Sequence, residues 1–564
     1  MKYLFSKVGW LFLIFFLLLI PVSERANCTA EAVQGKCDPD FDGNGIVNYL
    51  DFKVISDCWL WYGQDGDNTA DLNLSGSVDF KDFAVFAAKW FYEKDSVAIV
   101  IDSNTYFALQ SEIQRFKTDI ENDLGVQVFI FDNNWSDIFT IKNILEEKYN
   151  RDRLVGAIFI GEIPTAYFEY QNSGSMPSDW YFQDFSDNFF DTDGDGKFER
   201  EYYLNETDVT MRDIWTGRLK APLGRSEGIE MLRSYLDRNH KYRTGDLKYA
   251  ERMLYFGSVA INQNGISERE YFELVDQISQ YTGLYESDDG VNALYDASLE
   301  MQKQIYLWEL TKNYDFAFVN IHGSASTQWL GGATYVYYDE IKKARPGPLF
   351  SVLASCSNGD FTQENYFAGW YLFSGNSLAV TANTIPTMLV GATSPEFLKD
   401  YIPLGLGATF GQMCKNDRSF MVTHLLGDPT LAMRRKPLGE LPAMTIDKSH
   451  LEFADTLRGM KTTKYISFEN NGSATLKISF VKARFSINNR WENLGYWDVF
   501  YYRHPETGSF FRDFEVPAEE SKNVTFVFYP REDAPDGKYS MTMLFQTNDP
   551  QNPYLEITLI GFAL

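Results

Sequence analysis

The middle of the chain is built from short apolar runs separated by amphipathic stretches. The apolar runs are SVAIVID, VQVFIFD, LVGAIFIGEIP, RMLYFGSVA, FAFVNIHG, LFSVLASC and SLAVTANT. Between them, stretches such as YFELVDQISQYTG place apolar residues at helical spacing. Continuous apolar strands that alternate with helices are typical of a doubly wound, largely parallel sheet covered on both faces. We therefore predict an α/β domain over residues 96–437.

A different pattern follows the Pro-rich linker PLGELP at residues 437–442. Polar and apolar residues alternate in KYISFENNGSATLKISF, where Asn-Gly separates two strand patterns, and again in KYSMTMLFQTNDPQNPYLEITLIGFAL. Asn-Gly between alternating segments is a strong β-hairpin signal. We predict an immunoglobulin-like β-sandwich over residues 443–564.

The first residues have the pattern of an export signal. Two lysines precede an apolar stretch over residues 10–22, which is too short to span a bilayer comfortably. We predict a signal peptide over residues 1–26 and no membrane span in the mature chain. The expected location is secreted or extracellular, and attachment to the cell surface is an alternative. Export permits a disulfide such as Cys37 with Cys58, but Cys28 leaves the pairing open.

Two acidic loops occupy the region between the signal and the α/β domain, in DFDGNGIVNYLD and DLNLSGSVDFKD. They begin 31 residues apart (71 minus 40), and Gly45 and Gly76 hold the sharp-turn position of each. Calcium prefers several oxygen ligands on such a curled loop. The predicted ligands at positions 1, 3, 5, 9 and 12 are Asp40, Asp42, Asn44, Asn48 and Asp51 in the first loop, and Asp71, Asn73, Ser75, Asp79 and Asp82 in the second. The alternative is a pair of acidic turns without metal.

This tandem pattern, with Asp in place of Glu at position 12, resembles the dockerin modules, and we assign it to residues 28–94. The resemblance implies calcium-dependent folding, with calcium as a structural cofactor, and a cohesin-type partner. Ser75 is a weaker ligand than the residue at the same position of the first loop.

The overall charge narrows the classes of partner. The formal net charge is -27 and the sequence pI is about 4.6. Because nucleic acids and anionic lipids bind clusters of Lys and Arg, this balance disfavours both. We therefore expect no nucleic-acid partner, and the expectation of a protein or peptide substrate comes instead from a family resemblance of residues 96–437.

Two of the predicted strands end on reactive side chains. FAFVNIHG ends on His322 followed by Gly323, and LFSVLASC ends on Cys356, 34 residues later (356 minus 322). Ligands bind outside the carboxyl ends of strands in doubly wound sheets, so the two residues form a candidate nucleophile and acid/base pair. Asp360 and Gln363 form a capping signature, which predicts a helix that begins close to Cys356 and favours its thiolate. The alternatives are an inert buried thiol and a loop histidine.

Several motifs of residues 96–437 together resemble the gingipain family of cysteine peptidases, in the caspase-like clan. They are His-Gly at one strand end, small residues and Cys at the next, NGDF, HLLGDPTLAMR, FIGEIP, SDWYF and DIWTGRL. The resemblance implies that Cys356 is the nucleophile, that His322 protonates the departing amine, and that the N–H groups of Gly323 and Cys356 hold the oxyanion. The family often has Gly where this chain has Ile321 before the histidine.

The same resemblance extends to further residues. Asp213 aligns with the acidic residue that orients the histidine, and a solvated loop acid is its alternative. Gingipain-like members favour Arg or Lys before the scissile bond, and Glu227 is the nearest acid for such a pocket. A structural calcium is implied at DTDGDGKFERE, near Asp191, Asp193 and Asp195, although position 12 of that loop would be Tyr202. An acidic surface turn is the alternative. In the last domain, FQTNDPQNP resembles Hydin-like immunoglobulin domains.

The sequence therefore predicts a secreted cysteine endopeptidase. One rival is a non-catalytic attachment protein that acts through its dockerin-like and immunoglobulin-like modules. Another is a thiol esterase or transpeptidase, in which a different nucleophile attacks the acyl-enzyme.

Overall fold

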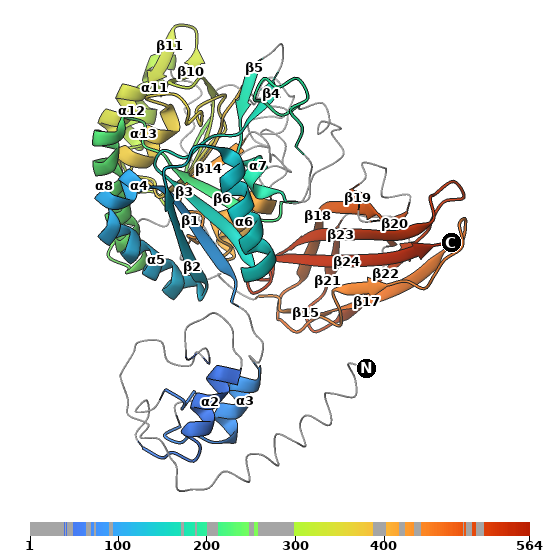
Figure 1. Ribbon diagram of the computed structural model, residues 1–564. Helices are drawn as coiled ribbons and strands as arrows, with labels where there is room; N and C mark the ends of the chain where they lie inside the picture. Colours follow the sequence, from blue (N-terminus) through green and yellow to red (C-terminus); the bar gives the residue numbers. More distant parts are fainter. Residues whose placement is uncertain are drawn as a thin grey trace. The chain divides into compact units, whose positions relative to one another are not determined.

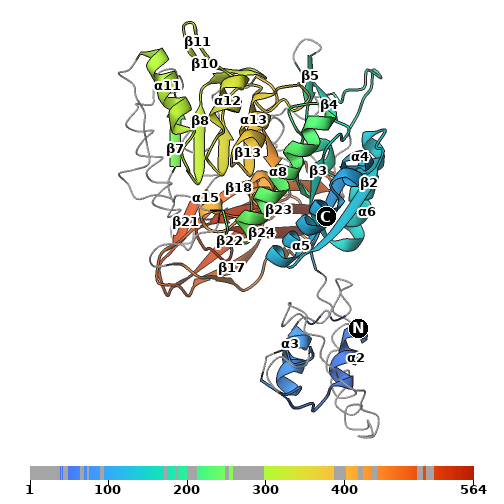
Figure 2. The ribbon, with the colours of Figure 1, turned by 90° about the vertical axis from the view of Figure 1, so that its left-hand side faces the viewer.

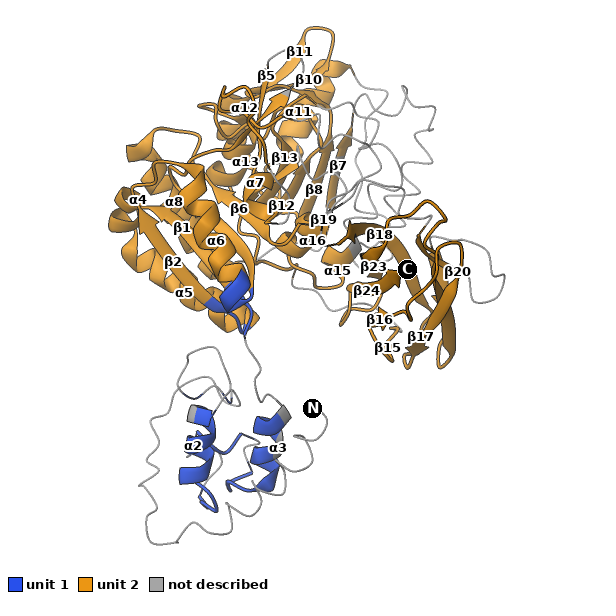
Figure 3. Cartoon of the chain, turned by 45° about the vertical axis from the view of Figure 1, so that its right-hand side comes forward, with its two compact units in different colours: residues 1–96, 125–127, 150–153 blue, residues 97–124, 128–149, 154–564 orange. Residues whose placement is uncertain are grey.

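A computed structural model describes a large part of the chain. The described residues are 39, 41, 49–63, 69–72, 75–88, 94–170, 174–185, 189–199, 212–247, 253–257, 298–386, 402–416, 423–433, 441–488, 490–491, 499–503 and 513–564. They belong to two compact units, residues 1–96 with 125–127 and 150–153, and the remainder (Figure 3). The predicted signal peptide, the helix in YFELVDQISQYTG and Cys28 and Cys37 lie outside the described residues.

The first unit contains two short helices, α2 (Tyr49–Asp57) and α3 (Phe80–Ala88). Ile55 of α2, Phe86 of α3 and Val78 of the second predicted calcium loop are buried together in one small core. Cys58 is disulfide-bonded to a partner outside the described residues.

A nine-stranded mixed sheet organises the second unit, in the order β2-β1-β3-β6-β14-β13-β12-β8-β7 (Figure 1). Neighbouring pairs β3–β6, β7–β8, β8–β12 and β12–β13 are parallel, whereas β14 runs antiparallel to β13. The strands are β1 (Ser96–Asp102), β2 (Gln127–Asn133), β3 (Leu154–Ile160), β6 (Trp215–Leu219), β7 (Met253–Gly257), β8 (Phe316–Asn320), β12 (Phe350–Leu353), β13 (Ala379–Asn383) and β14 (Thr423–Gly427). All seven predicted strands are confirmed, and β6 and β14 are additions.

Helices cover this sheet on both sides (Figure 2). In one layer α5 contacts α8, α8 contacts α13 and α13 contacts α12. Elsewhere α6 packs on Ala98 and Val100 of β1, and α16 packs near Phe316 and Phe318 of β8. The helices are α4 (Ser103–Ala108), α5 (Gln110–Leu124), α6 (Ile138–Asp152), α7 (Trp180–Gln183), α8 (Arg225–Arg243), α11 (Leu299–Glu309), α12 (Tyr338–Ala344), α13 (Phe367–Ser374), α15 (Ile402–Gly405) and α16 (Phe410–Asn416).

Two small antiparallel sheets accompany the large one. The first has the order β11-β10-β9 and is formed by β9 (His322–Gly323), β10 (Thr327–Gly331) and β11 (Thr334–Tyr337). The second is a hairpin of β4 (Tyr167–Tyr170) and β5 (Gly174–Pro177).

The C-terminal region is β-rich, as predicted. Its two sheets have the orders β15-β17-β22-β20 and β16-β24-β23-β18-β19, with β21 paired to β18. Ile466 and Phe528 from the first sheet share a core with Met541 and Leu559 from the second. The strands are β15 (Met444–Ile446), β16 (His450–Glu452), β17 (Thr462–Asn470), β18 (Leu476–Ile487), β19 (Arg490–Trp491), β20 (Phe500–Arg503), β21 (Asp513–Val516), β22 (Ser521–Phe528), β23 (Gly537–Thr547) and β24 (Tyr554–Ala563).

Candidate active site

Main-chain register brings His322 and Cys356 to equivalent places. The parallel strands β8 and β12 pair Val319 with Leu353. His322 and Cys356 each follow their paired residue by three positions (322 minus 319, 356 minus 353). The two side chains therefore leave the same edge of the sheet on neighbouring strands. Both residues are half-buried, whereas another cysteine of this unit, Cys414, is only 8% exposed.

Gly323 allows the two segments to approach closely. A Cβ atom on Gly323 would lie 2.7 Å from Asn358 Nδ2, 2.9 Å from the carbonyl oxygen of Cys356 and 3.0 Å from Ser355 Cβ. Such distances leave no room for a side chain, so glycine is required here for steric reasons. The main chain after His322 thus lies directly against the turn that contains Cys356.

Asn358 binds the two segments together, and sequence reasoning assigned it no role. Its side chain is fully buried, and Nδ2 donates to the carbonyl oxygens of Ser324 at 2.6 Å and Thr327 at 3.0 Å. Its Oδ1 accepts a hydrogen bond from Gln328 Nε2 at 3.0 Å. Gln328 Oε1 accepts in turn from the buried hydroxyl of Tyr306 at 2.9 Å, and burial raises the pKa of Tyr306 well above its usual value. One side chain therefore sets the spacing between the loops that carry His322 and Cys356.

The turn after Cys356 is held by main-chain geometry. Ser357 has a φ of 54°, and its N–H donates to Ile385 O at 3.1 Å, while Gly359 N–H donates to Asn383 O at 2.8 Å. The prediction of a helix that begins close to Cys356 is wrong. Asp360 caps a turn through Thr362, and the helix α13 begins only at Phe367. Its first N–H groups nevertheless reach both loops, because Phe367 N–H donates to Ala325 O at 2.7 Å and Ala368 N–H donates to Asn358 O at 2.9 Å.

Two of the motifs that carry the family resemblance contact each other next to this turn. Asp179 from SDWYF and Arg218 from DIWTGRL form a buried ion pair at 2.6 Å, and each side chain is almost completely excluded from solvent. The Arg218 guanidinium also lies 4.5 Å from the ring centroid of Phe361, in the segment that follows Cys356. His424 is buried beside them and accepts a hydrogen bond from Asp179 N–H at 3.0 Å. This cluster supports the Cys356 turn from below.

The structure does not bring Asp213 to His322. Asp213 lies just before the first residue of β6. The segment that follows Cys356 contacts the chain after the last residue of β6, where Asn365 N–H donates to Pro222 O at 2.8 Å. The Asp213 carboxylate accepts hydrogen bonds from Arg484 at 3.0 Å and from Phe185 N–H at 2.7 Å. The Arg484 contact links Asp213 to the C-terminal β-rich region. The His322 ring lies against the ring of Trp329, with centroids 5.3 Å apart.

Glu227, the weak candidate for a substrate pocket, lies exposed in the first turn of α8. Its carboxylate accepts a hydrogen bond from Ser226 Oγ at 2.5 Å, which lowers the pKa of Glu227 below its ordinary value.

The second predicted calcium loop has the geometry that a metal loop needs. The Asp71 carboxylate accepts from the N–H groups of Ser75 at 2.9 Å and Gly76 at 2.8 Å, and Gly76 has a φ of 79°. Asp82 is fully buried and accepts from Asp79 N–H at 2.9 Å. In the first loop Asp51 is fully buried and accepts from Phe41 N–H at 2.6 Å. The donor set and the curled backbone fit calcium. Four predicted ligands of the first loop and one of the second, Asp40, Asp42, Asn44, Asn48 and Asn73, lie outside the described residues.

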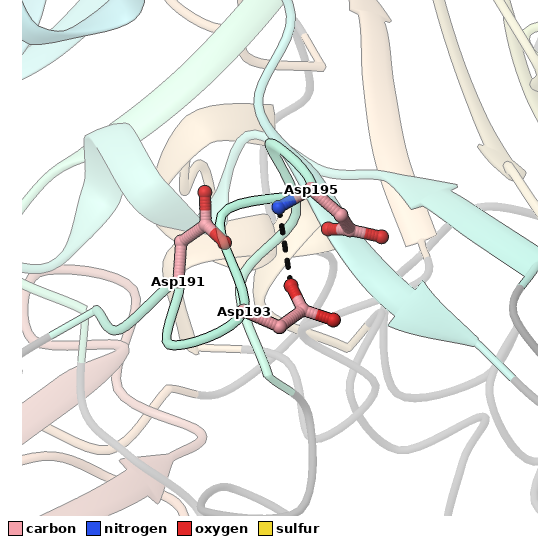
Figure 4. A group of neighbouring side chains, drawn as sticks. All are labelled: Asp191, Asp193 and Asp195. Atoms are coloured by element: carbon pink, nitrogen blue, oxygen red, sulfur yellow. Dashed lines mark hydrogen bonds between the residues drawn. The ribbon is translucent and has the colours of Figure 1, made fainter.

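The acidic loop in the second unit gathers three carboxylates (Figure 4). Ligand atoms of Asp191, Asp193 and Asp195 lie within 4.8 Å of one another, and all three residues are exposed. Asp191 accepts from the N–H groups of Gly194 at 2.8 Å and Gly196 at 3.0 Å. Gly196, at the sixth position, has a φ of 84°, which matches the role of glycine in the calcium loops. Lys197 donates to Asp195, which lowers the pKa of Asp195.

No family model matches the chain, and no curated protein matches it. Among solved structures, the chain is similar to PapD-like domain 7 of human CEP192, at 17% identity and a TM-score of 0.15, over 24% of this chain and 95% of that chain. It is also similar to a protein of unknown function from Porphyromonas gingivalis W83, at 15% identity and a TM-score of 0.16, over 25% and 56%. The E. coli chaperone DraB shows 8% identity and a TM-score of 0.15, over 22% and 55%. At such TM-scores these likenesses carry no argument about fold or function.

Among the described helices, none combines the length and the apolarity needed to span a bilayer.

Proposed function

We propose that the protein is a cysteine endopeptidase that uses Cys356 and His322. The observation that carries the proposal is the register of β8 with β12, which places a half-buried thiol and an imidazole at equivalent strand ends. The fit of Gly323 against the Cys356 carbonyl and the hydrogen bonds of Asn358 support it. Nucleophilic catalysis needs this kind of fixed nucleophile and acid/base pair.

In the proposed reaction, the Cys356 thiolate attacks the carbonyl carbon of the scissile peptide bond. The N–H groups of Gly323 and Cys356 donate to the oxyanion, which stabilises the tetrahedral intermediate. His322 gives a proton to the departing amine as the C–N bond breaks, and a thioester remains on Cys356. Water then attacks the thioester and regenerates the thiol, which distinguishes a peptidase from a transpeptidase.

Further proposals concern the metal loops and the other modules of the chain. The geometry around Asp71 and Asp82 supports structural calcium in a dockerin-like module at residues 28–94, and a cohesin-type protein is its proposed partner. Asp191, Asp193 and Asp195 are proposed to hold a further calcium. The two packed sheets of residues 443–564 are proposed to be immunoglobulin-like, and the peptidase domain to have a caspase-like fold. We propose a secreted or extracellular location and a preference for Arg or Lys before the scissile bond, which the net charge of -27 favours.

The test is active-site labelling followed by mutation. A peptidyl acyloxymethyl ketone should alkylate Cys356, as peptide mapping would show, and Cys356→Ala should abolish both labelling and hydrolysis. His322→Ala should lower kcat by on the order of 10³-fold. Cys414→Ala is the matched control, because Cys414 is a second described cysteine outside a disulfide and is buried. Hydrolysis that survives in Cys356→Ala refutes the peptidase and favours the attachment protein.

A further inference from the structure

The small sheet beside His322 carries aromatic side chains on one face. Register pairs His322 with Trp329 and Trp329 with Tyr335, and directly paired residues share a face. Tyr337 lies on the same face because it is two residues from Tyr335. Ring centroids lie 5.3 Å apart for His322 and Trp329, 6.5 Å for Trp329 and Tyr335, and 6.1 Å for Tyr335 and Tyr337. We call Trp329, Tyr335 and Tyr337 the aromatic row.

The side chains of the aromatic row are uncharged and partly solvent-facing, and the neighbouring Glu340 carboxylate is bonded to Tyr337 N–H at 3.0 Å and paired with Lys303 at 2.9 Å. Tyr335 is 37% exposed and Tyr337 is 48% exposed, whereas Gln328 and Val336 on the opposite face are fully buried. The indole N–H of Trp329 donates to Gly332 O at 3.0 Å, so the polar group of this side chain is satisfied within the hairpin. From residue 321 to 337 the sequence contains no Asp, Glu, Lys or Arg. A ligand of this surface is therefore recognised by apolar contact and not by charge.

We propose that the aromatic row binds the part of a polypeptide substrate that follows the scissile bond, and that it selects large apolar side chains there. The inference rests on the proposed peptidase function. The proposed reaction decides which part of the substrate meets the aromatic row, because His322 gives its proton to the departing amine. The residues attached to that amine must therefore pass beside His322, where the aromatic row begins.

The spacing of the rings fits an extended substrate. An extended chain rises about 3.3 Å per residue, and alternate side chains point to the same face, so side chains on one face are roughly 6.6 Å apart. The two steps that cross the strands, 5.3 Å from His322 to Trp329 and 6.5 Å from Trp329 to Tyr335, are close to this value, whereas Tyr337 lies two residues along β11 and is paired with Thr327. Alternate substrate side chains after the scissile bond then meet Trp329 and Tyr335, and each ring adds specificity for an aromatic or branched aliphatic residue.

The test uses quenched fluorescent peptides that are identical up to the scissile bond. Each of the three positions after the bond is varied in turn among Phe, Leu, Ser and Asp, and kcat/KM is measured. At one position or more, Phe and Leu should exceed Ser and Asp by about tenfold. Trp329→Ala should reduce that ratio severalfold. Trp308→Ala is the matched control and should leave the ratio unchanged, because Trp308 is an exposed tryptophan on α11.

The outcomes separate this inference from the function on which it rests. The first test of function is whether the wild-type protein cleaves peptides and is labelled at Cys356 by a ketone that has no residues beyond the scissile position. If it passes this test but shows equal kcat/KM for Phe, Leu, Ser and Asp, the role of the aromatic row is refuted and the peptidase function stands. If it is neither labelled nor active, both are refuted. Tyr335→Ser provides a second variant, further from His322, should Trp329→Ala fail to fold. Quenching of tryptophan fluorescence by soluble oligosaccharides, lost in Trp329→Ala and unaffected by peptides, would overturn the proposal in favour of a glycan site.

Discussion

Replacement of Asn358 by Asp tests whether its hydrogen bonds set the catalytic spacing. The change keeps the shape of the side chain but replaces the Nδ2 donor with an oxygen that faces the carbonyl oxygens of Ser324 and Thr327. Two hydrogen bonds are lost in a fully buried place, and two carbonyl groups lose a partner. Each unsatisfied buried group costs about 1–3 kcal/mol, so the loss of two such bonds should lower the free energy of unfolding by roughly 2–6 kcal/mol.

Activity should fall further than this loss of stability explains. Displacement of the His322 loop by about 1 Å relative to Cys356 costs on the order of 10²-fold in rate. We therefore expect kcat for peptide hydrolysis to drop by about that factor at temperatures where the variant stays folded, with a smaller change in the rate at which the ketone labels Cys356. Steady-state kinetics, labelling rates and thermal unfolding followed by circular dichroism provide these quantities.

Asn365→Asp is the matched control for the same chemical change. Asn365 is half-buried in the same segment and has a φ of 58°, which both Asn and Asp tolerate. The backbone N–H of Asn365, which the substitution keeps, donates to Pro222 O. The reasoning would be refuted if Asn358→Asp retained the kcat and the unfolding temperature of the wild-type protein, or if Asn365→Asp lost as much of both.

Three further predictions concern other parts of the chain. Arg484→Met should lower the free energy of unfolding of the second unit by about 3–5 kcal/mol, because it removes the cation that the buried carboxylates of Asp184 and Asp213 share. The control Arg458→Met removes an exposed ion pair and should cost under about 1 kcal/mol. Denaturant unfolding measures both values. Calcium should raise the unfolding temperature of the full chain's first transition, and Asp71→Ala should abolish that rise; a calorimetric trace indifferent to calcium contradicts the metal loops. Burial raises the pKa of Tyr181 to about 12, so its contribution to stability is complete below pH about 10 and is lost as the pH rises toward 12; Tyr181→Phe should show a shallower decline over that interval.

The main-chain framework of the site was predictable from the sequence, because uninterrupted apolar runs locate buried strands well. Phe316–Asn320 and Phe350–Leu353 were both predicted, and the residues that follow them gave His322 and Cys356. The short strands β6 and β14 were missed because WTGRL and THLLG contain polar residues at buried positions. In both cases a partner that is distant in sequence satisfies the polar group, and no local pattern records such a partner.

The incorrect helix prediction and the contacts of Asp213 illustrate the same limit of local sequence patterns. A capping signature at Asp360 was interpreted as the start of a helix, but Asp side chains cap turns as readily as helices, and here the carboxylate accepts from Thr362 N–H within a turn. Asp213 was assigned to His322 by resemblance, but its charge is neutralised by Arg484, 271 residues away. A short stretch of sequence does not show whether a capped turn continues into a helix, and it does not show an ion pair between residues that are far apart in the chain.

The placement of the candidate pair depends on two kinds of interaction that respond differently to mutation. The β8–β12 register is held by main-chain hydrogen bonds within a buried sheet, so side-chain changes at the site leave it in place. The distance between the two loops beyond the strands depends instead on Asn358, Gln328 and the close contact at Gly323. A Cβ at Gly323 must displace either Asn358 or the Cys356 carbonyl, since both lie within 2.9 Å of it. Substitutions at these loop positions therefore change catalysis before they change the sheet, and a loss of activity in a folded variant can be assigned to the spacing of His322 and Cys356.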